Sequence, residues 1–163
     1  MGIRLPLASN RTVRVAGPGI PEILGQPALV FSRLSGNEGI CSLFEYELEL
    51  KTPDDRNAHF GPAADLDTKA LRGQELTVTI ALDGSGSGSS GGVGAGEREI
   101  TGLVTDVRGP IPMGRQIAYR LTLRPWLWLA TLTTDFRIFQ QQSVVQILDT
   151  LLSDYTFPVE RRL

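Results

Sequence analysis

The chain has 163 residues, of which 41% are hydrophobic and 21% charged, and its formal net charge is −2. This length fits one domain better than two, and the near balance of charge argues against a nucleic-acid partner. No segment reaches the roughly 20 apolar residues of a membrane span, and the N-terminus lacks the features of a signal peptide. We therefore expect a protein made in the cytoplasm, without stable membrane insertion. Cys41, the only cysteine, excludes an internal disulfide.

Alternating apolar and polar side chains predict a series of antiparallel strands. Residues 29–34 form the first, followed by a turn at residues 35–39. Residues 43–50 form the clearest strand, with three glutamates on its polar face and four apolar side chains facing inward. Those inward residues are Phe44, Tyr46, Leu48 and Leu50.

A surface loop is expected over residues 53–62, where glycine and proline interrupt a polar stretch. A short helical turn is predicted over residues 66–71, entered through Asp65 and stopped by Gly73. The next strand spans residues 75–82, with Leu76, Val78, Ile80 and Leu82 on one face.

Residues 84–96 are almost entirely Gly and Ser and cannot bury enough apolar surface to offset the entropy of ordering. We expect a flexible loop joining two paired strands, and a domain boundary is the less favoured alternative. The strands at residues 97–107 and 117–124 form the next hairpin, connected through residues 109–114.

After the last strand, Pro125 suits the first position of a helix, and Trp126 and Trp128 follow in an apolar turn. We expect both tryptophans in the core or at an interface, with the sheet curled around them. Residues 137–139 are predicted to be extended. A C-terminal helix is predicted near residues 143–154, because Ser143 and Gln146 form a capping-box pattern before an apolar stripe.

The outward glutamates Glu45, Glu47 and Glu49 raise the possibility of an acid–base or metal site, but no histidine accompanies them. A structural surface or subunit contact is the favoured interpretation. Four aspartates do not match the spacing of a calcium loop. They are Asp54, Asp55, Asp65 and Asp67.

Nucleophilic catalysis would require His59, the only histidine, beside Cys41 or a serine. Nothing around Ser32, Ser35 or Ser143 resembles a nucleophile elbow, and no third orienting group is evident for Cys41. The glycine-rich segment has no following Lys-Ser or Lys-Thr, so it is not a phosphate-binding loop. We predict no catalytic residue, no metal site and no cofactor.

Six segments, taken together and in order, resemble the VgrG family of type VI secretion system spike proteins, also known as Rhs element Vgr proteins. They span most of the chain from residue 29 onward. The segments are LVFSRLSGNEG at 29–39, LFEYELEL at 43–50, LRGQ at 71–74, GLVTD at 102–106, YRLTLRPWLWL at 119–129 and DFRIFQ at 135–140.

The resemblance implies an antiparallel β-barrel of the phage tail hub type with short helices, forming a single N-terminal domain over residues 1–163. The family has a shorter turn around residues 83–97 and a much longer chain, so we expect a fragment of a longer protein. The implied role is structural and not enzymatic. The implied partners are further copies of the chain in a homotrimer, the Hcp tube, and secreted effectors or adaptor proteins.

The resemblance places the protein in the cytoplasm before firing, and afterwards outside the cell or inside a target cell. The alternative function is a small β-barrel carbohydrate-binding module or hydrolase that uses Trp126, Trp128 and the glutamates at 45–49. Exposure of the tryptophans in an open cleft would favour this alternative.

Overall fold

The computed structural model describes residues 13–20, 22–23, 26–53, 67–83, 95–157 and 159. It divides the chain into two compact units, Met1–Pro125 and Trp126–Leu163, called here the first and second units. The expected single hub-like domain over residues 1–163 stays a prediction. Among the described residues, no helix has the length and apolar character needed to cross a membrane.

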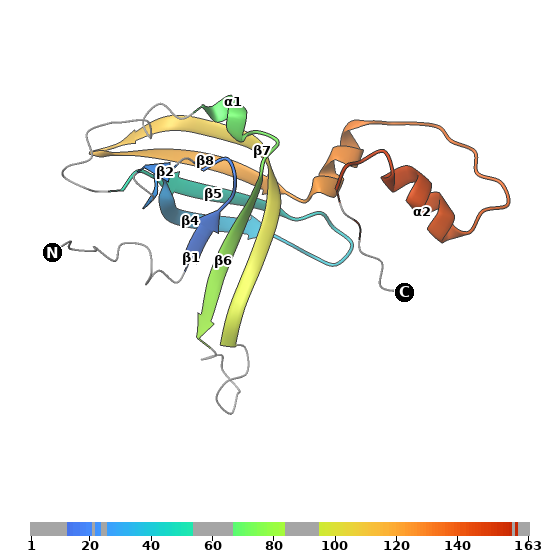
Figure 1. Cartoon of the computed structure of the whole chain (residues 1–163), viewed down its shortest axis with the longest axis horizontal. Helices are drawn as coiled ribbons and strands as arrows, with labels where there is room; N and C mark the ends of the chain where they lie inside the picture. The colour runs from blue at the N-terminus through green and yellow to red at the C-terminus, as the bar shows by residue number, and fades with distance from the viewer. Residues whose placement is uncertain are drawn as a thin grey trace. The chain divides into compact units, whose positions relative to one another are not determined.

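The first unit is built on one six-stranded antiparallel sheet (Figure 1). Its strands, in spatial order, are β1 (Val13–Ala16), β6 (Glu75–Asp83), β7 (Ala95–Met113), β8 (Gln116–Arg124), β5 (Glu45–Lys51) and β4 (Val30–Asn37). A short ribbon of β2 (Glu22–Ile23) and β3 (Gln26–Pro27) accompanies it. The edge strands β1 and β4 approach each other but are not hydrogen-bonded in the described sheet. The predicted mainly antiparallel β architecture is confirmed, as a barrel that is not closed.

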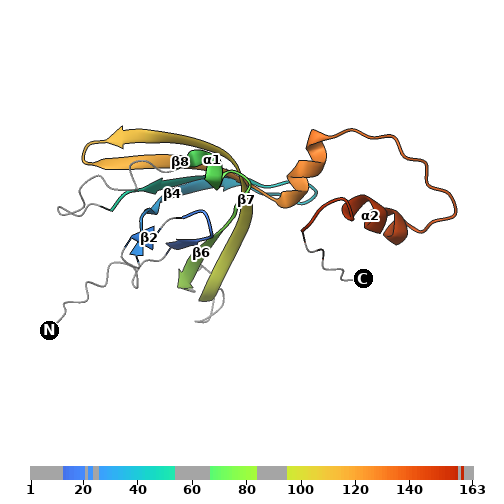
Figure 2. The same ribbon diagram turned by 45° about the horizontal axis from the view of Figure 1, so that its top comes forward.

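Strand β7 is long and curved, and it connects the two halves of the sheet (Figures 1 and 2). Its first part pairs with β6 and its second part pairs with β8. The predicted connection at residues 109–114 is wrong, because Ile111 to Met113 continue the ladder opposite Gln116 to Ala118. The chain reverses instead at Gly114, whose φ of 65° suits glycine, and Arg115.

The core lies on the inner face of this curved sheet. Alternation predicted it correctly in β5, where Tyr46, Leu48 and Leu50 are buried. In β6, Leu76 and Val78 are buried, whereas Leu82 is exposed. The full core cluster comprises Leu29, Tyr46, Leu48, Leu50, Leu71, Leu76, Val78, Ile100, Val104, Val107, Tyr119, Leu121 and Leu123.

Two local boundaries differ from the prediction. Helix α1 spans Thr68–Leu71 and is capped by Asp67, whose side chain accepts hydrogen bonds from the backbone amides of Lys69 and Ala70. The expected entry through Asp65 is therefore wrong. Gly73 does end this helix, with a φ of 82°. Strand β4 runs to Asn37 across the predicted turn, because Ser35 to Asn37 pair with Glu47 to Glu45.

Parts of two predicted loops lie outside the described residues, namely residues 54–62 of the polar loop and 84–94 of the Gly/Ser segment. Ala95 and Gly96, which were predicted to belong to the latter, instead begin β7 opposite Asp83 and Leu82. The strands on both sides of the segment are paired, as expected for neighbours in one sheet.

The second unit contains a 3₁₀ helix, η1 (Trp126–Leu132), and the helix α2 (Val144–Leu152). The predicted capping box is confirmed, since Ser143 Oγ accepts from the Gln146 amide and Gln146 Oε1 accepts from the Ser143 amide. Residues 133–142 connect the helices without regular secondary structure, so no strand forms at residues 137–139.

Replacing Leu48 by Ala should lower the free energy of unfolding by about 2–5 kcal/mol, because a fully buried side chain leaves a cavity in the core. Leu43→Ala is the matched control, since Leu43 is exposed and lies just before the same strand; its effect should be below about 1 kcal/mol. Urea unfolding measures both variants. Equal losses would contradict the assigned inner face of β5.

Candidate functional site

Two of the three outward glutamates of β5, Glu45 and Glu49, form ion pairs with arginines of the neighbouring strand β8. The register places Glu49 opposite Arg120 and Glu47 opposite Thr122. Because side chains alternate along a strand, the polar residues of β5 and β8 share the outer face while their apolar neighbours share the core. The predicted row of carboxylates is therefore one side of a cross-strand charge pattern, here called the charged face.

Glu49 is the most enclosed carboxylate of this face, with its side chain 13% exposed. It accepts hydrogen bonds from Ser32 Oγ at 2.9 Å and from Arg120 Nε at 3.2 Å. The Ser32 hydrogen bond, with further contributions from Arg120 and Arg33, lowers the pKa of Glu49 below its usual value. A carboxylate held ionised in this way is poorly suited to act as a general acid near neutral pH.

Glu45 is bound by Arg124 through two nitrogens, Nε at 2.8 Å and Nη2 at 2.5 Å from Oε2. Arg124 Nη1 also donates to Thr105 Oγ1 at 3.1 Å, so this arginine links β5, β8 and β7. Asp106 of β7 forms ion pairs with Arg72 and Arg108. Side-chain contacts on the charged face therefore link β5, β7 and β8, in addition to the backbone hydrogen bonds between these strands.

A second charged group, missed in the sequence, links the connection before β5 to β7. Arg98 forms an ion pair with Glu38 and lies 3.4 Å from the hydroxyl of Tyr46. The Tyr46 hydroxyl and Arg98 together lower the pKa of Glu38, and burial raises the pKa of Tyr46. These residues are far apart in the chain and carry no motif, so only the fold brings them together.

The other candidate groups do not assemble into a catalytic arrangement among the described residues. Cys41 is exposed in the connection between β4 and β5, and His59 lies outside the described part of the chain. Ser32 donates to Glu49, and Ser143 caps α2. Of the four aspartates, only Asp67 is described, and it caps α1. Within the described ranges, no group of three His, Cys, Asp or Glu residues could hold a metal ion.

Neither tryptophan belongs to the core cluster of the sheet, whereas the sequence analysis expected the sheet to curl around them. Trp126 is partly buried in the second unit, where its ring stacks on Phe157 at 5.4 Å between centroids with an interplanar angle of 10°. The ring of Tyr155 lies 5.8 Å from that of Trp126. Two neighbouring aromatic rings therefore pack against Trp126 and form a local aromatic cluster within the second unit.

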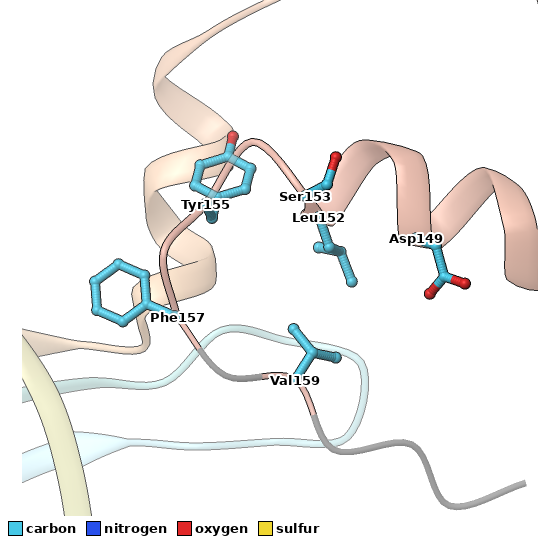
Figure 3. A pocket seen from close by; sticks show the side chains of 6 residues that line it. All are labelled: Asp149, Leu152, Ser153, Tyr155, Phe157 and Val159. Carbon is cyan, nitrogen blue, oxygen red and sulfur yellow. The ribbon is translucent and has the colours of Figure 1, made fainter.

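Next to this cluster lies an open hollow of about 300 Å³ (Figure 3). Its lining comes from the end of α2 and the segment after it, and the exposed part of this lining is more polar than apolar. The lining residues are Asp149, Leu152, Ser153, Tyr155, Phe157 and Val159.

Protonation of Glu49 should destabilise the first unit in acid. Its folded-state pKa is lowered, so its contribution is present above the unfolded value near 4.5 and is lost as the pH falls through the folded value. Glu49→Gln should therefore show a shallower loss of stability between about pH 5 and pH 2 than the parent chain. Urea unfolding at several pH values tests this, with Glu47→Gln as the control, and parallel profiles for Glu49→Gln and the parent would contradict it.

Trp126→Ala should loosen the second unit by about 1–2 kcal/mol, less than a full core truncation, because the stacked ring is only partly buried. Amide hydrogen exchange should accelerate in α2 and remain unchanged at residues 119–123 of β8. Equal acceleration in both places would show that Trp126 supports the sheet core after all.

Comparisons with known proteins agree with this architecture. Residues 37–163 match the model of the phage tail baseplate hub (GPD) family. The chain is 33% identical over 154 residues to the type VI secretion system spike protein VgrG1c of Pseudomonas aeruginosa, and 34% identical over 149 residues to VgrG1b of the same organism. These alignments cover 94% and 91% of this chain but only 18% and 17% of the relatives.

A solved structure shares the fold at low sequence identity. It is the E. coli c3393 protein, described as a component of the type VI secretion system with structural similarity to the T4 bacteriophage tail proteins gp27 and gp5. The TM-score is 0.58 at 16% identity, over 90% of this chain and 32% of that one. The chain therefore belongs to the phage tail baseplate hub (GPD) family, as a VgrG-type protein.

Proposed function

We propose that this chain is a structural part of a type VI secretion system spike. In this role it forms part of a trimeric hub that docks on the Hcp tube and carries the point that punctures a target envelope. The chain spans less than a fifth of the length of its VgrG relatives, so the proposal concerns its part in a larger protein.

The proposal rests on the antiparallel sheet of the hub family. One face of this sheet carries the apolar core, and on the other face two of the glutamates of β5 form ion pairs. Glu45 and Glu49 are both ion-paired to arginines of β8, which leaves neither as a free acid or base. Continuous antiparallel pairing from β1 to β4, reinforced by these cross-strand pairs, suits a part that must keep its shape under load.

A non-enzymatic role follows from the same proposal, because the family match supports a structural component. The other expected partners, secreted effectors or adaptor proteins, also remain proposals. The localisation of the protein is a proposal too: it is made in the cytoplasm, and when the system fires it leaves the cell or enters a target cell.

No specific observation favours the alternative of a carbohydrate-binding module or hydrolase. Sugar binding by stacking needs an accessible aromatic face, and Trp126 is engaged by Phe157 and Tyr155.

The proposed role can be tested in the bacterium that encodes the protein, after deletion of any other spike-protein genes. Leu121→Asp in the full-length protein places a charge in the sheet core, and it should abolish release of Hcp into the medium. Thr122→Lys is the control on the outer face of the same strand, where the new charge lies opposite Glu47, and it should leave release largely intact. Immunoblots of culture supernatants measure both.

Normal Hcp release with Leu121→Asp would contradict the structural role. The alternative function is tested on the purified chain by tryptophan fluorescence during titration with oligosaccharides. A saturable change that is lost in Trp126→Ala would support sugar binding instead.

A further inference from the structure

The charged side chains on the outer face of the sheet form a line across four strands. Arg33 of β4 lies opposite Glu49 of β5, which in turn lies opposite Arg120 of β8. On the other side of Arg120, the register places Arg108 of β7. Positive and negative charges therefore alternate from β4 to β8, but the alternation fails between β8 and β7. Arg108 and Arg120, which are neighbours there, are called here the arginine pair.

The arginine pair is unfavourable by itself. Side chains in directly opposite positions have Cβ atoms only about 4.5–5.5 Å apart, and like charges in such positions repel each other. The two side chains are held by different carboxylates: Arg120 Nε donates to Glu49 at 3.2 Å, and Arg108 Nε donates to Asp106 at 3.3 Å. Within the described part of the chain, no carboxylate lies between the two arginines in the register of β7 and β8.

The nearby carboxylates do not neutralise the arginine pair, because they are shared with other groups. Arg72 Nη2 donates to Asp106 Oδ1 at 3.0 Å. Glu49 also accepts a hydrogen bond from Ser32 and lies opposite Arg33.

Together, four arginines and three carboxylates of this part of the face leave one positive charge unbalanced. The arginines are Arg33, Arg72, Arg108 and Arg120, and the carboxylates are Glu47, Glu49 and Asp106.

The arginine pair lies on an open surface. The side chain of Arg108 is 73% exposed and that of Arg120 is 48% exposed. A free ion bound at such a place stays in water, where an ion pair contributes little. A protein that docks on the surface removes water from the contact, and charge attraction is then stronger. The planar guanidinium group also matches the geometry of a carboxylate.

We propose that the arginine pair is a docking point for an acidic segment of a protein partner, with a carboxylate of that segment between Arg108 and Arg120. The carboxylate supplies the negative charge that the alternation lacks at this position. The inference goes beyond the proposed function and does not depend on it, because it follows from the charges of the sheet alone.

Titration of the purified 163-residue chain with a hexaglutamate peptide at low ionic strength, followed by proton–nitrogen NMR, tests the docking point. Amide signals around Arg108 and Arg120 should shift and saturate. Arg108→Gln and Arg120→Gln should each raise the dissociation constant about threefold to fivefold, the change expected for one exposed ion pair. Arg14→Gln is the matched control and should bind like the parent, because Arg14 is 59% exposed and already paired with Glu97.

Two further titrations identify the source of the negative charge. A glycine–serine peptide of the same length should cause no saturable shift, and inorganic phosphate should shift the same signals only at much higher concentration. Phosphate binding as tight as that of hexaglutamate would overturn the assignment to a protein carboxylate.

A parent chain without saturable shifts would also overturn the inference, as would equal weakening by Arg14→Gln and by the variants of the arginine pair. The dispersion of the amide signals establishes that each variant is folded. If Arg120→Gln is not, because it loses the contact with Glu49, Arg108→Gln and Arg108→Lys decide the matter. Arg108→Lys keeps the charge and should weaken binding less than Arg108→Gln.

Discussion

The pairing of β5 with β8 is the constraint on which the rest of the first unit depends. Its register sets Tyr46 opposite Leu123, Leu48 opposite Leu121 and Leu50 opposite Tyr119, and all six side chains are buried. The same register brings Glu49 to Arg120 and Glu45 to Arg124 on the other face. A slip of one residue would exchange the two faces, placing charges in the core and leucines in water. Burial and ion pairing therefore favour one register for independent reasons.

The same register explains the glutamates of β5. In the sequence they resemble a possible active site, but in the structure Glu45 and Glu49 form ion pairs that link neighbouring strands. Catalytic acids and bases generally have pKa values moved toward neutrality, whereas the pKa of Glu49 moves in the opposite direction. Exposed ion pairs each contribute little, about 0–1 kcal/mol, but those of β5, β7 and β8 form a connected pattern across three strands. Such a pattern specifies which strands are neighbours and in which register.

Strands β4 to β8 and helix α2 were predictable, because their signals are local. Alternation places Leu48 and Leu50 on one face whatever lies opposite, and the Ser143–Gln146 capping box requires only four consecutive residues. The continuation of β7 past Gly109 and Pro110 was not predictable, because pairing with β8 overrides the turn preference of those residues. The cluster of Glu38, Tyr46 and Arg98 was also missed, since its members come from separate elements.

The sequence by itself determined which side chains must leave water and in what order along each strand, because these follow from residue type and from the period of the backbone. Only the tertiary structure decided what the buried side chains meet, because partners in a sheet are chosen by long-range pairing. The tryptophans show the difference. Their size required apolar neighbours, and Trp126 has them in Tyr155 and Phe157, about 30 residues later in the chain, a pairing that no local pattern in the sequence announces.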